Sequence, residues 1–341
     1  MSAALHNRAR YASIPGPLVD PEGVRGMKYD YSSIGFFTFD CLGWPFTVVP
    51  EGGGAIFIDE LTLAVSGAAG TAAIAASKMG LKTLAVGGVG SDLMGDWVIN
   101  RLKHFNVDTS GMQCLSTSRT SSSIVTTRLD GSRPALHMKG ATGDFFVGDD
   151  FLAMAIDARV VHLGGVGLMD KMDAGRGAEL LQAAKKNGSI TTVDIFAGSK
   201  DDLGTVKRVL PFTDYFMPSI DEAKALTGLS DAQDMAEIFF GLGAACCVFT
   251  LGEAGAYYHH RNGERFHMPA FDIKVKCTCG CGDAFNAGMA VAFCRGFDPQ
   301  TAVRFAQATA ALNATGLGSQ AGVVSFEHTW NFMRQTPMRK Q

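Results

Sequence analysis

The stretch that decides the fold is K-V-K-C-T-C-G-C-G-D-A-F-N-A-G, residues 274–288. Two interpretations of its centre compete. Three cysteines at alternate positions, Cys277, Cys279 and Cys281, could be metal ligands. Two glycines and Asp283 in front of a small-residue segment are instead typical of a phosphate-binding loop that opens a helix. The choice decides between a metalloprotein and a phosphotransferase.

A metal site is the weaker interpretation of this stretch. A structural zinc site needs four ligands, usually supplied as pairs of cysteines or histidines. The stretch supplies at most three thiolates, and the nearest histidine, His267, lies ten residues before Cys277. No C-x-x-C or H-x-x-x-H pair occurs elsewhere. We therefore expect no metal at these thiols.

The phosphate-loop interpretation accounts for more of the residues. Gly280 and Gly282 lack a Cβ, so neighbouring backbone N–H groups can turn toward an anion. A helix that begins near Asp283 directs its unpaired N–H groups and the positive end of its dipole to the same point. Asp283 could be only the N-cap of that helix. A carboxylate beside an anion site is unfavourable, however, unless it has a function there, such as taking a proton from an attacking hydroxyl.

Composition narrows the class of protein. The chain has 341 residues, with 30 basic and 33 acidic residues mixed along it and a net charge of −3, which argues against nucleic acid or an anionic membrane as a partner. No segment approaches the ~20 apolar residues of a membrane span. The N-terminus lacks the apolar segment of a secretory signal, so the eight cysteines are interpreted as reduced thiols. We expect a cytoplasmic protein.

The chain is divided into an irregular lead-in, residues 1–28, and one domain, residues 29–341, in which short apolar strands alternate with helices. The expected strands are 32–40, 82–90, 158–165, 189–194, 214–218 and 246–252, followed by a hairpin around 261–263. The expected helices are 65–80, 95–105, 174–187, 220–228, 284–295, 299–314 and 325–334. This alternation predicts an α/β fold with a mainly parallel central sheet and helices on both faces.

Two insertions interrupt the alternation, at about 44–65 and 119–139. Both contain strand-like patterns, and the second has an Asp130-Gly131 turn typical of a hairpin. They predict a small β-sheet lid over the crevice at the carboxyl ends of the parallel strands, where α/β folds bind ligands.

Residues 277–283 resemble the D-T-x-G-A-G-D signature of the ribokinase-like (PfkB) carbohydrate kinase family, with Cys277 at the first Asp and Cys281 at the Ala. The resemblance covers nearly the whole chain from Tyr29, and further family motifs follow one another in the family's order. These are G-x-x-x-x-D at 35–40, the G-G-x-x-x-N signature within 66–96, N-x-x-E at 219–222, T-x-G at 250–252 and the late F-A-N-A-A-A helix at 305–310.

This resemblance implies a parallel-sheet α/β domain with a β lid, and phosphorylation of a hydroxyl on a sugar or nucleoside with ATP and Mg2+. It implies that Asp283 is the general base and that the N–H groups of Gly280, Cys281, Gly282 and Asp283 form the anion hole. Glu222 would orient Mg2+ through water, although a surface glutamate on a helix has the same sequence pattern. The resemblance also implies a homodimer paired through the lids.

On the acceptor side, the resemblance points to Asp40, Gly67 and Thr71. Asp40 could otherwise be a solvated carboxylate at a strand end, and Gly67 a plain helix start. Thr71 replaces the sugar-contacting Asn of the family, so an amide donor is lost. Lys139, at the end of the second insertion, could reach an anionic group, although most exposed lysines do not.

On the nucleotide side, the resemblance points to Ser219, Thr250, Gly252 and Gln307. Ser219 and Gln307 stand where the family has asparagines. These replacements leave open a binding protein on the kinase scaffold, and a nucleoside remains an alternative acceptor. We expect an active sugar kinase, because Asp283 is retained beside the glycines of the loop.

Overall fold

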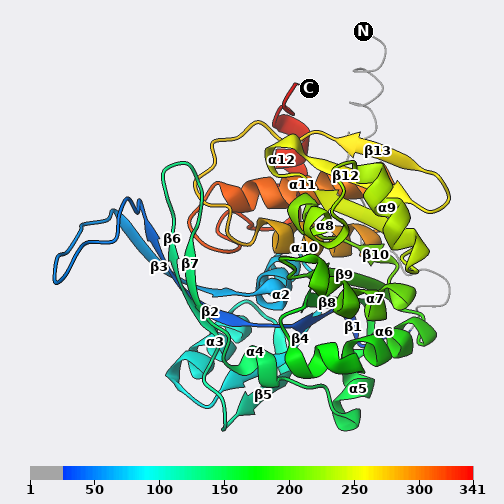
Figure 1. Cartoon of the computed structure of the whole chain (residues 1–341), viewed down its shortest axis with the longest axis horizontal. Helices are drawn as coiled ribbons and strands as arrows, with labels where there is room; N and C mark the ends of the chain where they lie inside the picture. The colour runs from blue at the N-terminus through cyan, green and yellow to red at the C-terminus, as the bar shows by residue number, and fades with distance from the viewer. Residues whose placement is uncertain (1–25, 341) are drawn as a thin grey trace.

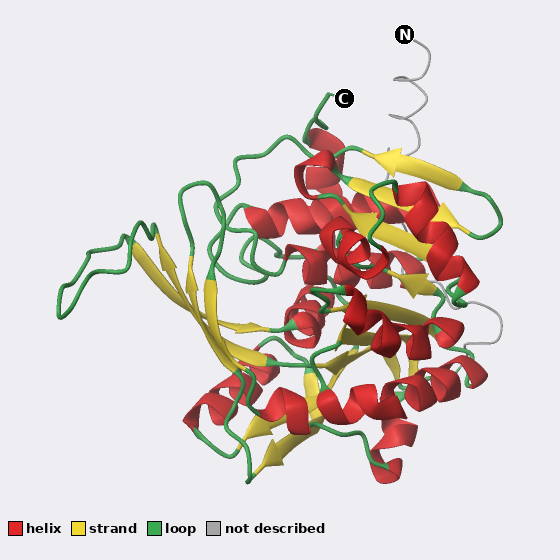
Figure 2. Cartoon of the chain, in the orientation of Figure 1, coloured by secondary structure: helices red, strands yellow, loops and turns green. Residues whose placement is uncertain are grey.

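The computed structural model describes residues 26–340, which form a nine-stranded sheet with helices on both faces and a separate four-stranded sheet at one side (Figures 1 and 2). The strand order of the large sheet is β13-β12-β11-β10-β9-β8-β1-β4-β5. All neighbours from β11 to β5 pair in parallel, and β12 and β13 add an antiparallel hairpin. The predicted fold class is confirmed.

The strands of the large sheet lie where alternation placed most of them. They are β1 (Tyr29–Gly35), β4 (Thr83–Gly90), β5 (Asp108–Leu115), β8 (Ala158–Val166), β9 (Ile190–Ile195), β10 (Tyr215–Phe216), β11 (Cys246–Thr250), β12 (Ala256–His260) and β13 (Arg265–Met268). Strands β4 and β8 are buried along their whole length, because helices cover both faces of the sheet. Strand β5 was not expected. It lies at the edge of the sheet and its sequence, DTSGMQCL, is largely polar.

The helices divide between the two faces. Helices α2, α3, α10, α11 and α12 pack on one face, and α5 to α9 on the other. Their bounds, with the single-turn α4, are α2 (Ala68–Lys78), α3 (Leu93–His104), α4 (Ala141–Asp144), α5 (Asp149–Ala155), α6 (Gly177–Lys186), α7 (Leu203–Val209), α8 (Ile220–Thr227), α9 (Ala232–Gly241), α10 (Cys281–Cys294), α11 (Pro299–Ala314) and α12 (Phe326–Gln335). Helices α5, α7 and α9 were not predicted.

Helix α10 packs closely on α11 and α2 because small residues lie at the points of contact. At Gly288, an added Cβ would lie 2.6 Å from the Cα of Ala306 in α11, so the two backbones approach more closely than any side chain permits. Ala287 and Ala290 face the cluster that α10 shares with α2 and α12. This packing fixes the position of the α10 N-terminus.

The four-stranded sheet is the predicted lid, with the strand order β3-β2-β6-β7. Its strands are β2 (Thr38–Trp44), β3 (Glu60–Ser66), β6 (Ser122–Thr126) and β7 (Ala135–Met138). Within the first insertion, the strand-like pattern forms β3 only from Glu60, and residues 45–59 form a long loop. The lid projects from the side of the main domain in Figure 1.

The expected single strand at 32–40 is wrong. Strand β1 ends at Gly35 and the lid strand β2 begins at Thr38, so Asp40 lies within the lid and not at the end of a strand of the large sheet. Gly35 has φ 150°, and an added Cβ would lie 2.1 Å from the carbonyl oxygen of Gly164. The apolar sequence pattern continues through this turn. Periodicity alone therefore gives no sign that the chain passes from the large sheet to the lid here.

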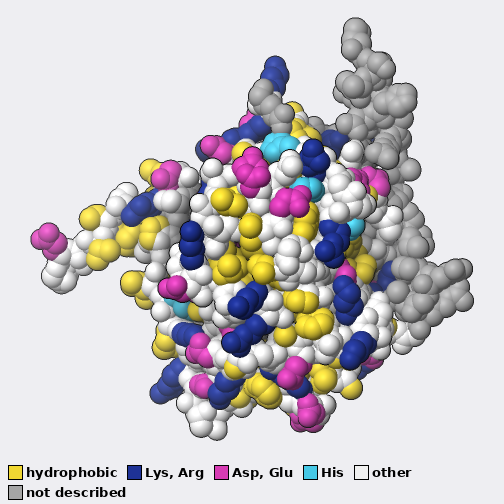
Figure 3. All heavy atoms as spheres, turned by 45° about the vertical axis from the view of Figure 1, so that its right-hand side comes forward, with side chains coloured by type: hydrophobic (Ala, Val, Ile, Leu, Met, Phe, Trp, Pro, Cys, Tyr) yellow, Lys and Arg dark blue, Asp and Glu magenta, His cyan; other side chains and the backbone are white. Residues whose placement is uncertain are grey.

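The surface carries no block of one charge on the face shown in Figure 3, where basic and acidic side chains are interspersed. Within residues 26–340, no helix has both the length and the apolar character required to cross a membrane. Residues 1–25 of the expected lead-in lie outside the described residues.

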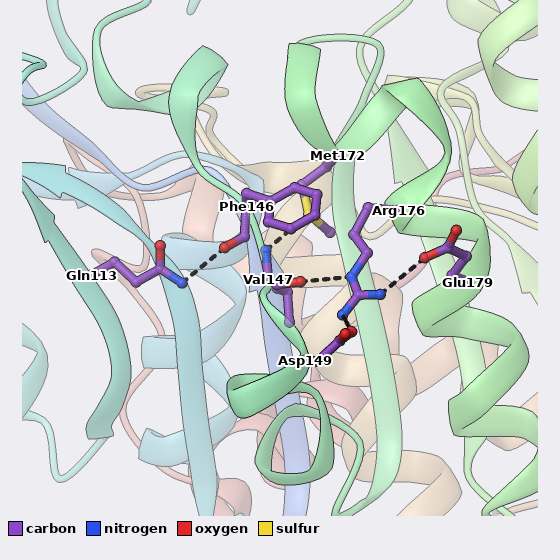
Figure 4. A network of polar contacts seen from close by, with 7 residues as sticks. All are labelled: Gln113, Phe146, Val147, Asp149, Met172, Arg176 and Glu179. Carbon is purple, nitrogen blue, oxygen red and sulfur yellow. Dashed lines mark hydrogen bonds and ion pairs between the residues drawn. The ribbon is translucent and has the colours of Figure 1, made fainter.

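Arg176 fastens the segment after the lid to the main domain (Figure 4). Its Nε donates to the carbonyl oxygen of Val147 at 2.6 Å, and its two terminal nitrogens reach Asp149 at 2.7 Å and Glu179 at 2.9 Å. The preceding carbonyl, of Phe146, accepts from Gln113 of β5 at 2.9 Å. The chain that leaves the lid is therefore anchored both to the edge strand β5 and to the segment before α6.

Candidate active site

The loop before α10 turns sharply at Gly280, which has φ 73°. An added Cβ there would lie 2.9 Å from Cγ2 of Thr71 and 3.0 Å from Cβ of Ser319, so the position requires glycine in both conformation and space. Within residues 26–340, the N–H groups of Gly282 and Asp283 have no protein acceptor, whereas that of Cys281 donates to the Thr278 carbonyl at 3.3 Å. The first turn of α10 thus presents free N–H donors.

Asn313 of α11 stabilises this loop through hydrogen bonds. Its Nδ2 donates to the carbonyl oxygen of Cys279 at 2.7 Å, and its Oδ1 accepts from the N–H of Gln320. The carbonyl oxygen of Ala314 accepts from the N–H groups of Lys276 and Cys277 at 2.8 and 3.3 Å. Asn313 is fully buried and was not singled out from the sequence, where it is one residue in an alanine-rich helix.

Asp283 is partly buried in the first turn of α10. Its pKa is raised to about 6, mainly by burial and also by the carboxyls of Glu222 and Asp40, against the guanidinium of Arg133 and the hydroxyl of Thr71, which lower it. At neutral pH the group is therefore mainly a carboxylate whose proton affinity is increased. That is the property of an effective general base.

Two further carboxyls lie near Asp283. Burial raises the pKa of Asp194, at the end of β9, well above its ordinary value, and Glu222 and Asp283 raise it further. Burial also raises the pKa of Glu222, which accepts from the N–H and the hydroxyl of Ser219 at 2.9 and 2.6 Å. Glu222 and Ser219 form a capping box at the start of α8, so Glu222 also stabilises the start of this helix. The sequence analysis missed Asp194, whose only signal was its place at the end of a predicted strand.

The acceptor candidates lie between the lid and α2. Asp40 is buried, and within residues 26–340 its Oδ1 has no hydrogen-bond partner. It pairs across the lid with Ser123, whose hydroxyl lies 3.0 Å from Nδ1 of His137 on the next strand. Burial raises the pKa of Asp40, and the hydroxyl of Ser123 opposes that effect. The inner face of the lid thus carries a row of polar groups that sequence analysis recognised only at Asp40.

The other three acceptor candidates have different surroundings. Gly67 precedes α2 with φ 83°, and an added Cβ would lie 2.4 Å from the carbonyl oxygen of Phe36. Thr71 is fully buried beside Gly280. Lys139 pairs elsewhere, with its Nζ 2.5 Å from Oδ1 of Asp170.

A cavity of about 330 Å³ ends at the first turn of α10. Thr250, Gly252 and Gln307 line it, as expected, and so do Cys281 and Gly282. Its remaining walls are mainly apolar and include Ala270, Phe271, Ile273, Val275, Phe285 and Ala310. Ser219 does not line the cavity but pairs with Thr250 beside it. The structure therefore brings the nucleotide candidates and the glycine loop around one space.

The three thiols of the loop have separate partners. Sγ of Cys277 accepts from the N–H of Cys279 at 3.4 Å, Sγ of Cys279 is 4.0 Å from Oγ of Ser319, and Nδ2 of Asn313 contacts Sγ of Cys281 at 3.4 Å. Burial raises the pKa of Cys279 to about 12 and that of Cys281 to about 11. Both favour the protonated thiol, which is a poor metal ligand. Within the described part of the chain, no three His, Cys, Asp or Glu side chains form a metal-binding group.

That these thiols bind no metal stays a prediction. We expect elemental analysis of the purified protein to find less than about 0.1 equivalent of zinc or iron, because the thiols have diverging partners and high proton affinity. One equivalent that disappears in a Cys277→Ser, Cys279→Ser variant would contradict it.

Comparison with known proteins agrees with this arrangement. The family model described as pfkB family carbohydrate kinase matches residues 52–325. A ribokinase of Haemophilus influenzae is 24% identical over 277 residues, which cover 80% of this chain and 88% of that protein. A deoxyribokinase of Salmonella typhi is 25% identical, with coverage of 82% and 90%.

Solved structures share the fold. Ribokinase of Arabidopsis thaliana, complexed with ribose and ATP, has a TM-score of 0.77 at 20% identity and covers 90% of this chain and 99% of its own. A ribokinase II from E. coli in complex with ATP and Mg2+ has a TM-score of 0.75 at 22% identity, with the same coverage. The predicted resemblance is confirmed: the chain belongs to the pfkB family of carbohydrate kinases.

Proposed function

We propose that the protein transfers the γ-phosphoryl group of ATP to a hydroxyl of a sugar or sugar derivative. One observation carries this proposal. The cavity that suits a nucleotide ends at Cys281 and Gly282 in the first turn of α10, where the N–H groups of Gly282 and Asp283 are free, and the Asp283 carboxyl in that turn is close enough to Asp40 of the lid to feel its charge. A phosphate donor and a hydroxyl acceptor would meet at a carboxylate that can take a proton.

In the proposed step, the Asp283 carboxylate removes the proton of the acceptor hydroxyl while its oxygen attacks the γ-phosphorus. The bond from that phosphorus to the bridging oxygen breaks and ADP leaves. The backbone N–H groups of Gly280, Cys281, Gly282 and Asp283 form the anion hole, with those of Gly282 and Asp283 free to donate. Both protein contributions depend on position rather than on a covalent bond to the enzyme.

The nucleotide is proposed to lie in the cavity beside Thr250, Gly252 and Gln307. Gln307 is buried at the wall of this cavity and, within residues 26–340, its Nε2 has no partner, so its amide is available to donate to a nucleotide. Ser219 supports this wall through its pairing with Thr250. Phe285 and Phe271 supply apolar surface suited to a base.

Mg2+ is proposed to be held near Glu222, through water, with Asp194 as a second carboxylate. The ion would neutralise phosphate charge as it develops. The raised pKa values of Glu222 and Asp194 fit this assignment, since carboxyls forced together in a buried site are relieved when a cation binds.

The acceptor is proposed to bind against Asp40, Gly67 and Thr71. The unpartnered Oδ1 of Asp40 can accept from a sugar hydroxyl, and Gly67 lets the acceptor approach the backbone. Lys139 would reach an anionic group only if its ion pair with Asp170 opened.

The proposed assembly is a homodimer through the lids in the cytoplasm. The outer face of the lid carries a row of apolar side chains, Leu63 on β3, Ile124 on β6 and Leu136 on β7, which are 44%, 57% and 72% exposed. Contiguous apolar surface of this kind marks an interaction site. The eight unpaired cysteines fit a reducing compartment.

Asp283→Asn should lower kcat by ~10²–10⁴, because the amide cannot accept the hydroxyl proton. The affinity for ATP should change little, since the anion hole is backbone.

The wild-type rate should fall as pH drops through about 6, where Asp283 becomes protonated. The effect on kcat is measured as turnover of ATP to ADP with free sugars, sugar phosphates, sugar acids and nucleosides as acceptors. Asp201→Asn, at an exposed residue, is the control. Full activity of the variant would mean that Asp283 is only a helix cap, and turnover with nucleosides alone would refute the sugar assignment.

Asp40→Ala should weaken acceptor binding about 10- to 100-fold, the value of a hydrogen bond to a charged group, and leave ATP binding unchanged. Asp59→Ala, an exposed carboxylate in the lid loop, should affect neither ligand. Separate calorimetric titrations of the acceptor and ATP decide the matter. Equal losses for both ligands would remove Asp40 from the acceptor site.

Ile124→Glu combined with Leu63→Glu should convert the proposed dimer to a monomer, because two charges would be buried at the contact. Sedimentation velocity measures the change. Val324→Glu introduces a charge at an apolar side chain that is 63% exposed and lies outside the lid, so it should leave the dimer intact. A monomeric wild-type protein would contradict the proposal.

A further inference from the structure

We propose that Arg339, in the segment that follows α12, binds the nucleoside part of the nucleotide with its guanidinium flat against the base. This inference rests on the proposed function, because it adds a residue to the same nucleotide cavity. The family model matches residues 52–325, so Arg339 lies beyond the match and no family motif assigns it a role. Its position becomes informative only in the fold, where it lines the cavity.

The segment after α12 pairs with one wall of the cavity. The N–H of Arg339 donates to the carbonyl oxygen of Ala270 at 2.8 Å, and the N–H of Asp272 donates to the carbonyl oxygen of Pro337 at 2.9 Å. Between these two bonds the paired segments run antiparallel. Because Ala270 lines the cavity, the backbone of Arg339 is held at the cavity wall.

The side chain of Arg339 is fixed as well. Its Nη1 lies 2.7 Å from Oε2 of Glu253, in the turn after β11, and the side chain is 37% exposed. Glu253 also lines the cavity, so both partners of the ion pair border it. A second cavity, of about 350 Å³, has Glu253, Ala270 and Arg339 among its lining residues too. The ion pair therefore lies at the boundary between two cavities, where a ligand of the first can contact it.

Arg339 lies at the end of the cavity that is remote from the loop before α10. The chain from Ala270 to Thr278 runs along one wall, and alternate apolar residues of this stretch line the cavity, namely Phe271, Ile273 and Val275. Arg339 contacts the stretch at Ala270, whereas the carbonyl oxygen of Thr278 accepts from the N–H of Cys281 at 3.3 Å. With the phosphates at the free N–H groups of α10, the base comes to the end where Arg339 lies.

The chemistry at this end favours a base over a phosphate. Among the described residues that line the cavity, Arg339 is the one basic residue, and Glu253 beside it balances its charge. A guanidinium paired with a carboxylate attracts a phosphate less, but its planar face still stacks on an aromatic ring. The neighbouring lining residues Ala270, Phe271 and Ile273 are apolar, as is typical of a wall that holds a base.

Binding measurements distinguish a contact with the base from a contact with the phosphates. Arg339→Met keeps the aliphatic part of the side chain and removes the guanidinium, so we expect it to weaken ATP and ADP binding by the same factor, about 3- to 30-fold. Inorganic tripolyphosphate, which has no base, should bind the variant as tightly as the wild type. Arg334→Met makes the same change at an exposed arginine of α12 and should leave all three affinities unchanged. Equal weakening of tripolyphosphate, or no weakening of ATP, would refute the proposal.

Two further measurements separate stacking from charge and from loss of structure. Arg339→Lys keeps the charge and loses the planar face, so its affinity for ATP should match that of Arg339→Met. Recovery to the wild-type affinity would rule out a contact with the base. Hydrogen exchange at the N–H of Asp272, which donates to Pro337, reports whether the segment after α12 stays in place. We expect the same exchange rate in Arg339→Met and the wild type, and faster exchange would attribute the lost affinity to detachment of the segment and overturn the direct contact.

The two proposals fail differently. Absence of ADP formation by the wild-type protein with every acceptor would refute the proposed function. Normal turnover by the wild-type protein, together with equal affinities of the wild type and Arg339→Met for ATP, would refute only the role of Arg339.

Discussion

The site depends on a single steric constraint, the absence of a side chain at Gly280. Thr71 of α2 and Ser319 of the loop after α11 approach this residue so closely that a Cβ would contact both. Their convergence brings the N-terminus of α10 against two other parts of the chain. The free N–H groups and Asp283 then have fixed directions, which a loop held only by its own ends would not provide. Asn313, buried in α11, keeps the same loop from relaxing away.

Four acidic side chains are buried around the candidate active site, an arrangement that does not favour the stability of the fold. Asp40, Asp194, Glu222 and Asp283 come from the lid, β9, α8 and α10, and burial raises the pKa of each. The carboxylates of Asp194 and Asp283 are also disfavoured by neighbouring carboxyls, so the free protein holds an arrangement that is more favourable when cations are present. Such strain at clustered titratable groups is characteristic of catalytic sites rather than of structural ion pairs.

Sequence reasoning was most successful where local pattern and tertiary structure agree. Alternating strands and helices predicted the parallel sheet, and glycines before a small-residue helix predicted the loop at Asp283. The sequence pattern failed where contacts between residues far apart in the chain determine the structure. The change of sheet after Gly35 depends on Gly164 of β8, which alternation cannot locate. Asp194 looked like an ordinary strand end, and Asn313 like an ordinary residue of an alanine-rich helix. Their importance arises only when the sheet and lid bring separate elements together.

Each strand of the lid has one face toward the crevice and one toward the outside, and successive residues point to alternate faces. On β2, Asp40 faces the crevice while Cys41 pairs with Leu63 and Ile124 on the outer side. Inserting or deleting one residue within such a strand would exchange the two faces, turning the carboxylate outward and the thiol inward. Length variation in the course of evolution is therefore tolerable in the 45–59 loop but not in the strands that flank it. Substitution of single side chains, by contrast, can alter the inner or the outer face of the lid without disturbing the other.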